Sequence, residues 1–179
     1  MASERSHRLE ALALRVRTTA QLQGRFTLRS GAVSDTYFDK FLLESDPLLF
    51  RALVELLVPL VPDDTEVLAG LELGGVPVVT VLSQITGLPA VFVRKQAKPY
   101  GTRKLVEGCS VFGRTLAVVE DVVTSGGQIA LSTADLRSAG AQVQVAVALV
   151  DRRQGDPDAL EAAGLELRCA LTREQIDAA

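Results

Sequence analysis

Residues 116–139 read LAVVEDVVTSGGQIALSTADLRSA, in which an apolar stretch, two acids, a hydroxyl–glycine turn and a helical pattern follow one another. The residues over 115–120 have the composition of a buried strand, and Asp121 follows Glu120 at its end. Thr124 to Gly127 suit a turn, after which we expect a helix over 127–139. A strand that leads through a short polar loop into a helix is typical of a parallel α/β sheet.

The same alternation of strand and helix patterns extends on both sides of this stretch. Ser45 or Asp46 is expected to cap a helix that has Pro47 in its first turn, and Thr172 to cap a last turn. The expected elements are helices over 4–23, 46–60, 76–86, 127–139 and 157–163, a hairpin over 26–39 turning at Ser30-Gly31, and strands over 66–70, 89–93, 115–120, 142–150 and 165–170. The sequence therefore predicts a doubly wound, mainly parallel sheet flanked by helices.

The length of 179 residues fits a single domain. We expect a small N-terminal hood over about residues 1–45, joined by the C-terminal tail, and a core over about residues 46–155. Active sites in such sheets lie at the carboxyl ends of the strands. Three loops follow such ends here, at 70–77, 94–108 and 120–127, so these loops are the first places to look for function.

The composition is that of a water-soluble globular protein, with 47% hydrophobic residues and a formal net charge of −3. This charge argues against generic nucleic-acid binding. The apolar runs are too short to cross a bilayer, and the N-terminus lacks the pattern of a secretory signal. Cys109 and Cys169 have no metal-type spacing and suit a reducing compartment, so we expect a cytoplasmic protein. The lone His7 is expected at the surface.

Glu120, Asp121 and the turn that follows have the chemistry needed to bind a ribose 5-phosphate. Carboxylates can accept hydrogen bonds from the two ribose hydroxyls, and burying them without such bonds is costly. Glycines let the backbone approach a ligand, and N–H groups at the start of a helix attract a phosphate. The alternative is a pair of solvated acids beside an ordinary turn. Dinucleotide and Walker sites are disfavoured, because neither motif occurs in the sequence.

The loop over 94–108 is basic although the protein as a whole is acidic. Between residues 92 and 105 there is no acid, and the cations are Arg94, Lys95, Lys98, Arg103 and Lys104. A loop that also contains Pro99 and Gly101 could close over a pyrophosphate leaving group and meet its charge. A solvated basic loop that binds no ligand is the alternative.

The string over 116–128 resembles the phosphoribosyl pyrophosphate signature of the type I phosphoribosyltransferases. That signature has four apolar residues, two acids and a Thr-Gly-type turn, and its first acid, often Asp, is Glu120 here. The resemblance implies the type I phosphoribosyltransferase fold, with Glu120 and Asp121 on the ribose hydroxyls. It also implies that the 5-phosphate is bound by Thr124, Ser125, Gly126, Gly127 and Gln128.

The basic loop resembles the catalytic loop of the orotate phosphoribosyltransferases. Its pattern of Arg-Lys, two residues, Lys, one residue, His or Tyr, then Gly is matched by Arg94, Lys95, Lys98, Tyr100 and Gly101. The resemblance implies a catalytic set of Lys98, Arg94, Lys95 and Asp121. Tyr100 stands where many members have histidine, so no role that needs an imidazole proton is carried over. In the family this loop reaches into the partner subunit's site, which implies a homodimer with shared active sites.

Two further segments resemble the base pocket of the same enzymes. Tyr37 and Phe38 match an aromatic pair that covers the base, and Arg29 stands where Lys is common. Arg152 matches the arginine that faces the carboxylate of orotate, which it could bind through two hydrogen bonds. The alternatives are an ordinary amphipathic hairpin over 26–39 and a surface ion pair between Asp151 and Arg152.

Residues 70–77, GLELGGVP, are the expected pyrophosphate loop, in which glycines would let backbone amides approach an anion. Glu72 is unexpected beside a polyanion, and the lysine that family members often have in this loop is missing. Either magnesium bridging or a Glu72 side chain that points away would reconcile its charge with this position.

Taken over residues 26 to about 155, the resemblance implies transfer of a phosphoribosyl group from phosphoribosyl pyrophosphate to orotate, giving orotidine 5′-monophosphate and pyrophosphate in pyrimidine synthesis. It implies Mg²⁺ as cofactor, held mainly by the substrate's phosphates and ribose and by Asp121 as a candidate ligand. No nucleic-acid or membrane partner is expected. Transfer to another nucleobase and a non-catalytic sensor of phosphoribosyl pyrophosphate remain alternatives.

Overall fold

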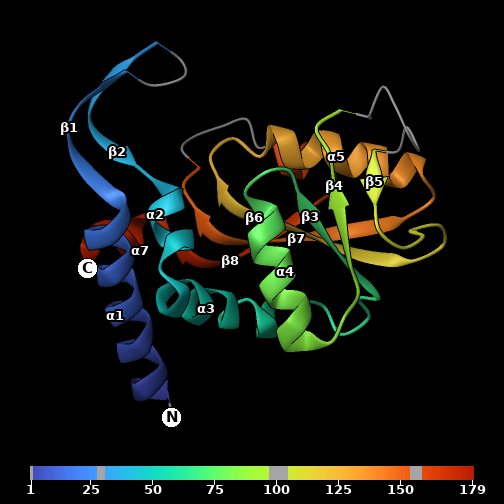
Figure 1. The fold of residues 1–179 in the computed structure, drawn as a ribbon, viewed down its shortest axis with the longest axis horizontal. Helices are drawn as coiled ribbons and strands as arrows, with labels where there is room; N and C mark the ends of the chain where they lie inside the picture. The colour runs from blue at the N-terminus through green and yellow to red at the C-terminus, as the bar shows by residue number, and fades with distance from the viewer. Residues whose placement is uncertain (1, 28–30, 97–104, 154–158) are drawn as a thin grey trace. The chain divides into compact units, whose positions relative to one another are not determined.

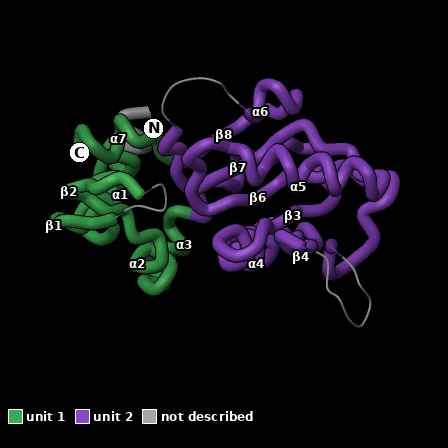
Figure 2. Tube along the Cα trace, turned by 90° about the horizontal axis from the view of Figure 1, so that it is seen from above, with its two compact units in different colours: residues 1–53, 171–179 green, residues 54–170 purple. Residues whose placement is uncertain are grey.

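The computed structural model describes residues 2–27, 31–96, 105–153 and 159–179, with side chains from residue 7 onward. The chain so described divides into two compact units, coloured green and purple in Figure 2. The first unit comprises residues 1–53 and 171–179, and the second comprises residues 54–170. The expected single domain with a hood and a core stays a prediction.

A six-stranded sheet in the order β5-β4-β3-β6-β7-β8 forms the centre of the second unit, as far as its residues are described (Figure 1). Its strands are β3 (Val67–Leu71), β4 (Ala90–Val93), β5 (Val106–Glu107), β6 (Thr115–Val123), β7 (Gln142–Asp151) and β8 (Glu166–Thr172). Strands β4, β3, β6 and β7 run parallel, and β5 pairs antiparallel with β4. The predicted mainly parallel sheet is confirmed.

Helices α4 (Gly75–Thr86) and α5 (Gly127–Ser138) cover opposite faces of this sheet. Successive side chains of a strand point to opposite faces. The Gly70 position of β3 faces α4, where an added Cβ would overlap Val79. The neighbouring Ala69 points the other way and joins a buried cluster with Leu136 of α5. The sheet is therefore doubly wound, as predicted. The unit also contains η1 (Val58–Leu60) and α6 (Ala159–Ala162).

The strand order places a topological switch between β3 and β6. From β3 the chain continues through α4 to β4 on one side, whereas β6 pairs with the other side of β3. Because β3, β6 and β7 are parallel, the loops at their carboxyl ends emerge at one edge of the sheet. Ligands of open α/β sheets bind at such a switch point, outside the carboxyl ends of the strands.

The first unit consists of helices and a β-hairpin. Its elements are α1 (Ala2–Ala20), β1 (Gln21–Thr27), β2 (Val33–Phe38), α2 (Lys40–Ser45), most of α3 (Pro47–Glu55) and α7 (Arg173–Ala178). Strands β1 and β2 pair antiparallel. Helix α1 contacts α2 and α7, and its apolar stripe supplies buried residues such as Val16 and Ala20.

The predicted helix caps at Asp46 and Thr172 are confirmed. Asp46 Oδ1 accepts the N–H groups of Leu48 and Leu49, both at 3.0 Å. The Leu49 N–H contributes most to lowering the pKa of the Asp46 carboxyl. Burial raises this pKa by less than that, and the Leu48 N–H and the Arg15 guanidinium lower it further. Thr172 forms a capping box with Gln175 at the start of α7. Both caps act as such side chains generally do, by satisfying free N–H groups in the first helical turn.

Several element boundaries differ from the sequence expectation. The first helix ends at Ala20 and not at residue 23, because residues 21–23 pair with residues 36–38 of β2. The helix expected over 46–60 is α3 followed by the separate η1, and α2 before it was not predicted. In the expected loop over 94–110, residues 106–107 form β5 by pairing with β4. No helix among the described residues is long and apolar enough to cross a membrane.

Candidate active site

Glu120 and Asp121 lie within β6, which runs to Val123 and not to residue 120 as expected. The strand is longer because β7 continues to pair with it, with Val123 opposite Asp151. Asp121 is only 2% exposed, and its Oδ1 accepts the Val122 N–H at 2.6 Å. Glu120 is half-buried, and its Oε1 accepts the Asp121 N–H at 3.0 Å. The two carboxylates are thus held by backbone donors of their own strand.

The turn after β6 leads directly into α5. Thr124 and Ser125 are exposed, and the Ser125 hydroxyl lies 3.5 Å from the Gly127 nitrogen. Gly126 has φ +72°, and a Cβ there would also lie 2.7 Å from Leu160 Cγ, so both conformation and space require glycine. The Gln128 amide donates to Ser132 Oγ, so this side chain bonds within its own helix.

A pocket of about 70 Å³ lies at this turn. It is lined by Glu120, Val122, Val123, Thr124, Ser125, Gly126, Gln128 and Ile129. The pocket therefore joins one of the two acids to the first N–H groups of α5, which have no partner within the helix and favour an anion.

Arg152 lies next to this turn at the end of β7. Its backbone N–H donates to the Val123 carbonyl at 2.8 Å, and its side chain is half-buried. The carboxylate of Asp151 is held by Arg153, with Nε 3.0 Å from Oδ1 and Nη2 2.9 Å from Oδ2. The ion pair considered from sequence was Asp151 with Arg152, whereas the pair in the structure uses Arg153.

Three glycines between residues 70 and 75 pack directly against neighbouring elements. A Cβ on Gly74 would overlap the carboxylate of Asp121, and one on Gly75 would overlap the Val119 carbonyl of β6. A Cβ on Gly70 would overlap Val79 of α4. We expected these glycines to let backbone amides approach an anion; their contacts within the protein already require residues without side chains.

Glu72 connects this loop to the start of the basic loop. Its Oε2 accepts the Lys95 N–H at 3.0 Å, and its own N–H donates to the Val93 carbonyl at 2.8 Å. Arg94 is half-buried and donates its N–H to the Leu105 carbonyl at 2.9 Å, while the side chain of Lys95 is exposed. Of the two explanations considered for Glu72, the structure favours the one in which its carboxylate is turned to a partner in the protein.

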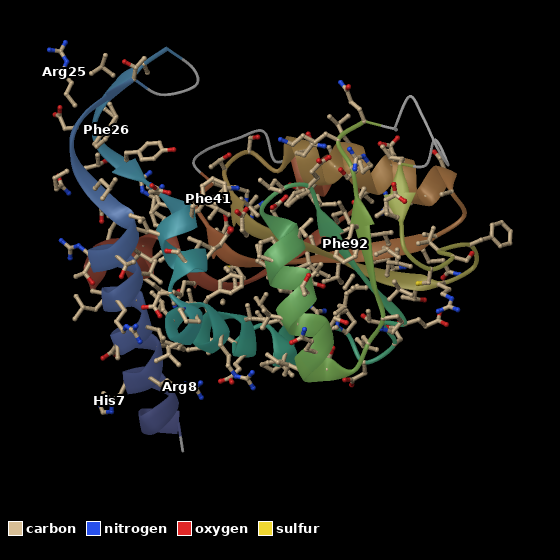
Figure 3. The ribbon with its side chains drawn as sticks, viewed as in Figure 1. His7, Arg8, Arg25, Phe26, Phe41 and Phe92 are labelled. Atoms are coloured by element: carbon tan, nitrogen blue, oxygen red, sulfur yellow. The ribbon has the colours of Figure 1, made fainter. Side chains whose placement is uncertain are left out.

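Several of the predicted site residues lie outside the part of the second unit that the structure describes. Arg29, Lys98 and Tyr100 lie outside the described residues. Tyr37 and Phe38 belong to β2 of the first unit, where adjacent side chains face opposite sides of the hairpin. Tyr37 packs on Phe26, with ring centroids 5.4 Å apart; Phe26 is labelled on the hairpin in Figure 3. Their role in covering a base stays a prediction.

The second unit therefore brings together most of the predicted residues at one edge of the sheet. Glu120 and Asp121 lie near the end of β6, the turn over 124–128 follows that strand, and Arg152 follows β7. Gly74 lies against Asp121. The sequence did not single out Gly74, and it gave no role to Glu72. The Gly74-Gly75 pair directly after a strand was the available signal, although it does not say which neighbour the glycines touch.

The described residues contain no cluster of three or more His, Cys, Asp or Glu side chains that could hold a metal ion. Cys109 and Cys169 form no disulfide bond among the described residues. His7 is exposed on α1, as predicted, and is labelled there in Figure 3.

Comparison with known proteins defines the class of this fold and site. No protein-family model matches the chain. A structure of Mycobacterium tuberculosis orotate phosphoribosyltransferase in complex with Fe(III) dicitrate is similar with a TM-score of 0.82 and 34% identity, covering 94% of this chain and 98% of that one. The same enzyme in complex with phosphoribosyl pyrophosphate gives a TM-score of 0.78 and 31% identity, covering 95% of this chain and 99% of that one. The fold is that of the type I phosphoribosyltransferases.

Sequence similarity narrows this class to one family. The orotate phosphoribosyltransferase of a Nocardioides species is 48% identical over 168 residues, which cover 94% of each chain. That of Methanocella arvoryzae is 37% identical over 93% of this chain and 95% of the relative. The chain belongs to the orotate phosphoribosyltransferase family.

Proposed function

We propose that this protein transfers the phosphoribosyl group of phosphoribosyl pyrophosphate to orotate, forming orotidine 5′-monophosphate and pyrophosphate. The observation that carries the proposal is the β6–turn–α5 unit, where the acid pair, the Gly126 turn and Arg152 meet at one edge of the sheet. Family membership and the related enzyme's complex with phosphoribosyl pyrophosphate support it.

The ribose 5-phosphate would lie along the turn after β6. The carboxylates of Glu120 and Asp121 would accept hydrogen bonds from the ribose hydroxyls. The phosphate binds the N–H groups at the start of α5 with the hydroxyls of Thr124 and Ser125. Gly127 suits this role, because among the described residues a Cβ there would meet only Ser125 Oγ, at 3.7 Å.

Arg94 and Lys95, together with Lys98, would stabilise the departing pyrophosphate. Positive charge develops on the ribose as the glycosidic bond breaks, and negative charge develops on the leaving group. Cations fixed in place before the reaction stabilise that charge without reorganisation. The reaction needs no side-chain nucleophile. Replacing Lys98 with Ala should lower kcat by about 100- to 1000-fold, as loss of such electrostatic stabilisation generally does.

The base would be selected by Arg152, with Tyr37, Phe38, Tyr100 and Arg29 as further candidates. The guanidinium of Arg152 can hold the carboxylate of orotate through two parallel hydrogen bonds. An uncharged base has no carboxylate to accept them. Its place beside the turn, with its N–H on the Val123 carbonyl, supports this role.

Mg²⁺ would be bound by Glu120 or Asp121 together with the substrate's own oxygens. Carboxylate oxygens are suitable donors, because Mg²⁺ usually binds one or two carboxylates with substrate phosphates and retains several waters. The ion would neutralise charge on the pyrophosphate.

A homodimer with shared active sites and a cytoplasmic role in pyrimidine synthesis complete the proposal. Mixing inactive Lys98→Ala and Asp121→Ala proteins tests the shared site. If Lys98 acts in the partner's site, mixed dimers regain one working site in two, so about a quarter of wild-type activity returns. Recovery of no activity, with dimers that do exchange subunits, would refute the shared site.

Absorbance measurements test the reaction directly. The protein is incubated with Mg²⁺ and phosphoribosyl pyrophosphate, and orotate, adenine, hypoxanthine and uracil are compared by ultraviolet absorbance and pyrophosphate release. Turnover of orotate alone is expected. Turnover of another base would replace the proposed substrate, and tight binding of phosphoribosyl pyrophosphate without turnover of any base would favour a sensor.

Arg152→Gln, with Arg153→Gln as the matched control, tests base selection. Arg152→Gln should raise the KM for orotate by about tenfold or more. Arg153→Gln removes the neighbouring guanidinium, which is occupied by Asp151, and should leave the KM for orotate close to that of the wild type. Equal effects of the two substitutions would remove Arg152 from the base pocket.

A further inference from the structure

Glu72 presents an acid in the loop where a pyrophosphate is expected, and its carboxylate makes a defined contact. Oε2 accepts the Lys95 N–H at 3.0 Å. Its backbone N–H donates to the Val93 carbonyl at 2.8 Å, so two bonds tie this one residue to the end of β4. Glu72 is thus bonded to Val93 and to Lys95. This pair of bonds brackets the start of the basic loop, where Arg94 and Lys95 are the cations assigned to the leaving group.

The same loop also contacts β6. A Cβ on Gly74 would overlap the Asp121 carboxylate, which shows how closely the loop backbone lies against the buried acid. Residues 72–75 therefore touch the end of β4 through Glu72 and the acid of β6 through Gly74. A single short loop bridges the two parts of the site that would handle the leaving group and the ribose.

We propose that Glu72 is a positioning residue, which fixes the backbone at Lys95 and thereby sets Arg94 and Lys95 relative to the acids of β6. This inference rests on the proposed function. Glu72 touches neither the ribose nor the base in this assignment. Its effect on the reaction passes through the backbone of Lys95.

The physical reason lies in how the carboxylate is used. A free carboxylate beside pyrophosphate would repel it, and residues 70–77 contain no lysine that could offset this negative charge. A hydrogen bond from a backbone N–H to an ionised carboxylate is stronger than a neutral one and is directional. Through this hydrogen bond the Glu72 side chain holds the chain at the point where the two cations begin. A small displacement of such groups is costly, because catalysis requires them to be placed before the reaction.

Glu72→Ala removes the acceptor, while Glu72→Gln keeps an oxygen that can accept the Lys95 N–H and removes only the charge. Glu66 provides a matched control at the opposite edge of the sheet. Its Oε2 accepts the Thr115 N–H at 2.9 Å, so Glu66→Ala deletes the same kind of bond away from the site. Each variant is compared with wild type in kcat, KM for phosphoribosyl pyrophosphate and amide hydrogen exchange.

Glu72→Ala is expected to lower kcat/KM by about tenfold or more and to speed exchange of the Lys95 amide by a similar factor, the usual effect of losing a hydrogen bond to a charged group. Glu72→Gln should retain most of both values, and Glu66→Ala should leave kcat/KM unchanged.

Three results would overturn the proposal. These are wild-type kinetics in Glu72→Ala, equal losses in Glu72→Gln and Glu72→Ala, or Lys95 amide exchange that is the same in wild type and Glu72→Ala. The second would mean that charge and not the hydrogen bond matters. If the wild-type protein did not use orotate, the proposed function would be refuted. Comparing the exchange rate of the Lys95 amide in wild type and in Glu72→Ala would still decide whether Glu72 fixes Lys95.

Discussion

Replacing Gly74 with alanine adds one methyl group against the Asp121 carboxylate. The backbone at Gly74 has φ −68° and ψ −32°, a conformation that any residue adopts, so the substitution introduces no backbone strain. The added Cβ would lie 2.7 Å from Asp121 Oδ1 and closer still to Oδ2 and Cγ. The whole effect of the substitution should therefore come from this one contact.

The size of the effect follows from these distances. Non-bonded heavy atoms normally lie about 3.5 Å apart, so Oδ1 alone would have to move by about 0.8 Å from its 2.7 Å position. Asp121 is 2% exposed and has little room to move. Overpacking of this kind costs about 1–3 kcal/mol of stability. Displacing a substrate-binding group by about 1 Å can lower the rate about 100-fold.

A double-mutant cycle measures the contact without relying on activity. Urea unfolding is followed for wild type, Gly74→Ala, Asp121→Ala and the double variant. With Asp121 shortened to alanine the overlap disappears, so Gly74→Ala should cost almost nothing in that background. The expected coupling free energy is about 1–3 kcal/mol.

Additive effects would refute this reasoning. If Gly74→Ala changed the free energy of unfolding equally in both backgrounds, within about 0.5 kcal/mol, the two residues would not be in contact. If Gly74→Ala were coupled to Asp121 but kept wild-type kcat/KM for phosphoribosyl pyrophosphate, the contact would stand and the ribose-binding role of Asp121 would fall.

Three other substitutions probe separate parts of the chain. Asp46→Asn keeps a capping oxygen but loses the carboxylate whose pKa folding lowers. The melting temperature of the variant should lie furthest below that of wild type near neutral pH, and the difference should vanish as the pH falls through the lowered pKa. A difference that persisted in acid would contradict the assignment. Gly126→Ala should lower the free energy of unfolding by about 1–3 kcal/mol, because residue 126 has a left-handed conformation and its Cβ would meet Leu160. The variant should also bind phosphoribosyl pyrophosphate more weakly by calorimetry. Gly87→Ala, at φ +76° with open space around the Cβ, should show the conformational cost alone. Arg137→Ala removes donors to backbone carbonyls at the start of β7 and after α6. We expect the free energy of unfolding in urea to fall by about 1–3 kcal/mol and kcat at 25 °C to stay unchanged. A fall in kcat of the folded protein would contradict a purely structural role.

The main elements were predictable because their signals are local. Alternating apolar stretches and helix patterns identified the strands and both long helices of the second unit, and Asp46 and Thr172 identified helix starts. Helix α1 was predicted too long, because only pairing with residues 36–38 shows that residues 21–23 are extended. The two residues of β5 form a strand only through their pairing with β4, so the sequence contained no signal for them.

The candidate site was predictable to the extent that its residues adjoin one another in the chain. Glu120, Asp121 and the turn over 124–128 form one continuous segment, and their placement at the carboxyl end of a strand could be inferred from the strand and helix patterns around them. Arg152 followed from a resemblance, and the structure places its backbone beside that turn. The pairing of Asp151 with Arg153 depended on side-chain geometry that spacing alone does not give.

By itself the sequence determined the α/β class, the acid pair with its phosphate-type turn and the family resemblance, because strand patterns, helix caps and turn residues act over a few neighbouring positions. Only the tertiary structure decided that Gly74 lies against Asp121 and that Glu72 holds the Lys95 N–H. These contacts join residues that are far apart in the chain, and their approach is set by sheet register and by packing of the whole core. A single sequence shows only which residue types occupy such contacts, here a glycine and an acid. Both residue types are also compatible with other surroundings, so they do not identify the contact.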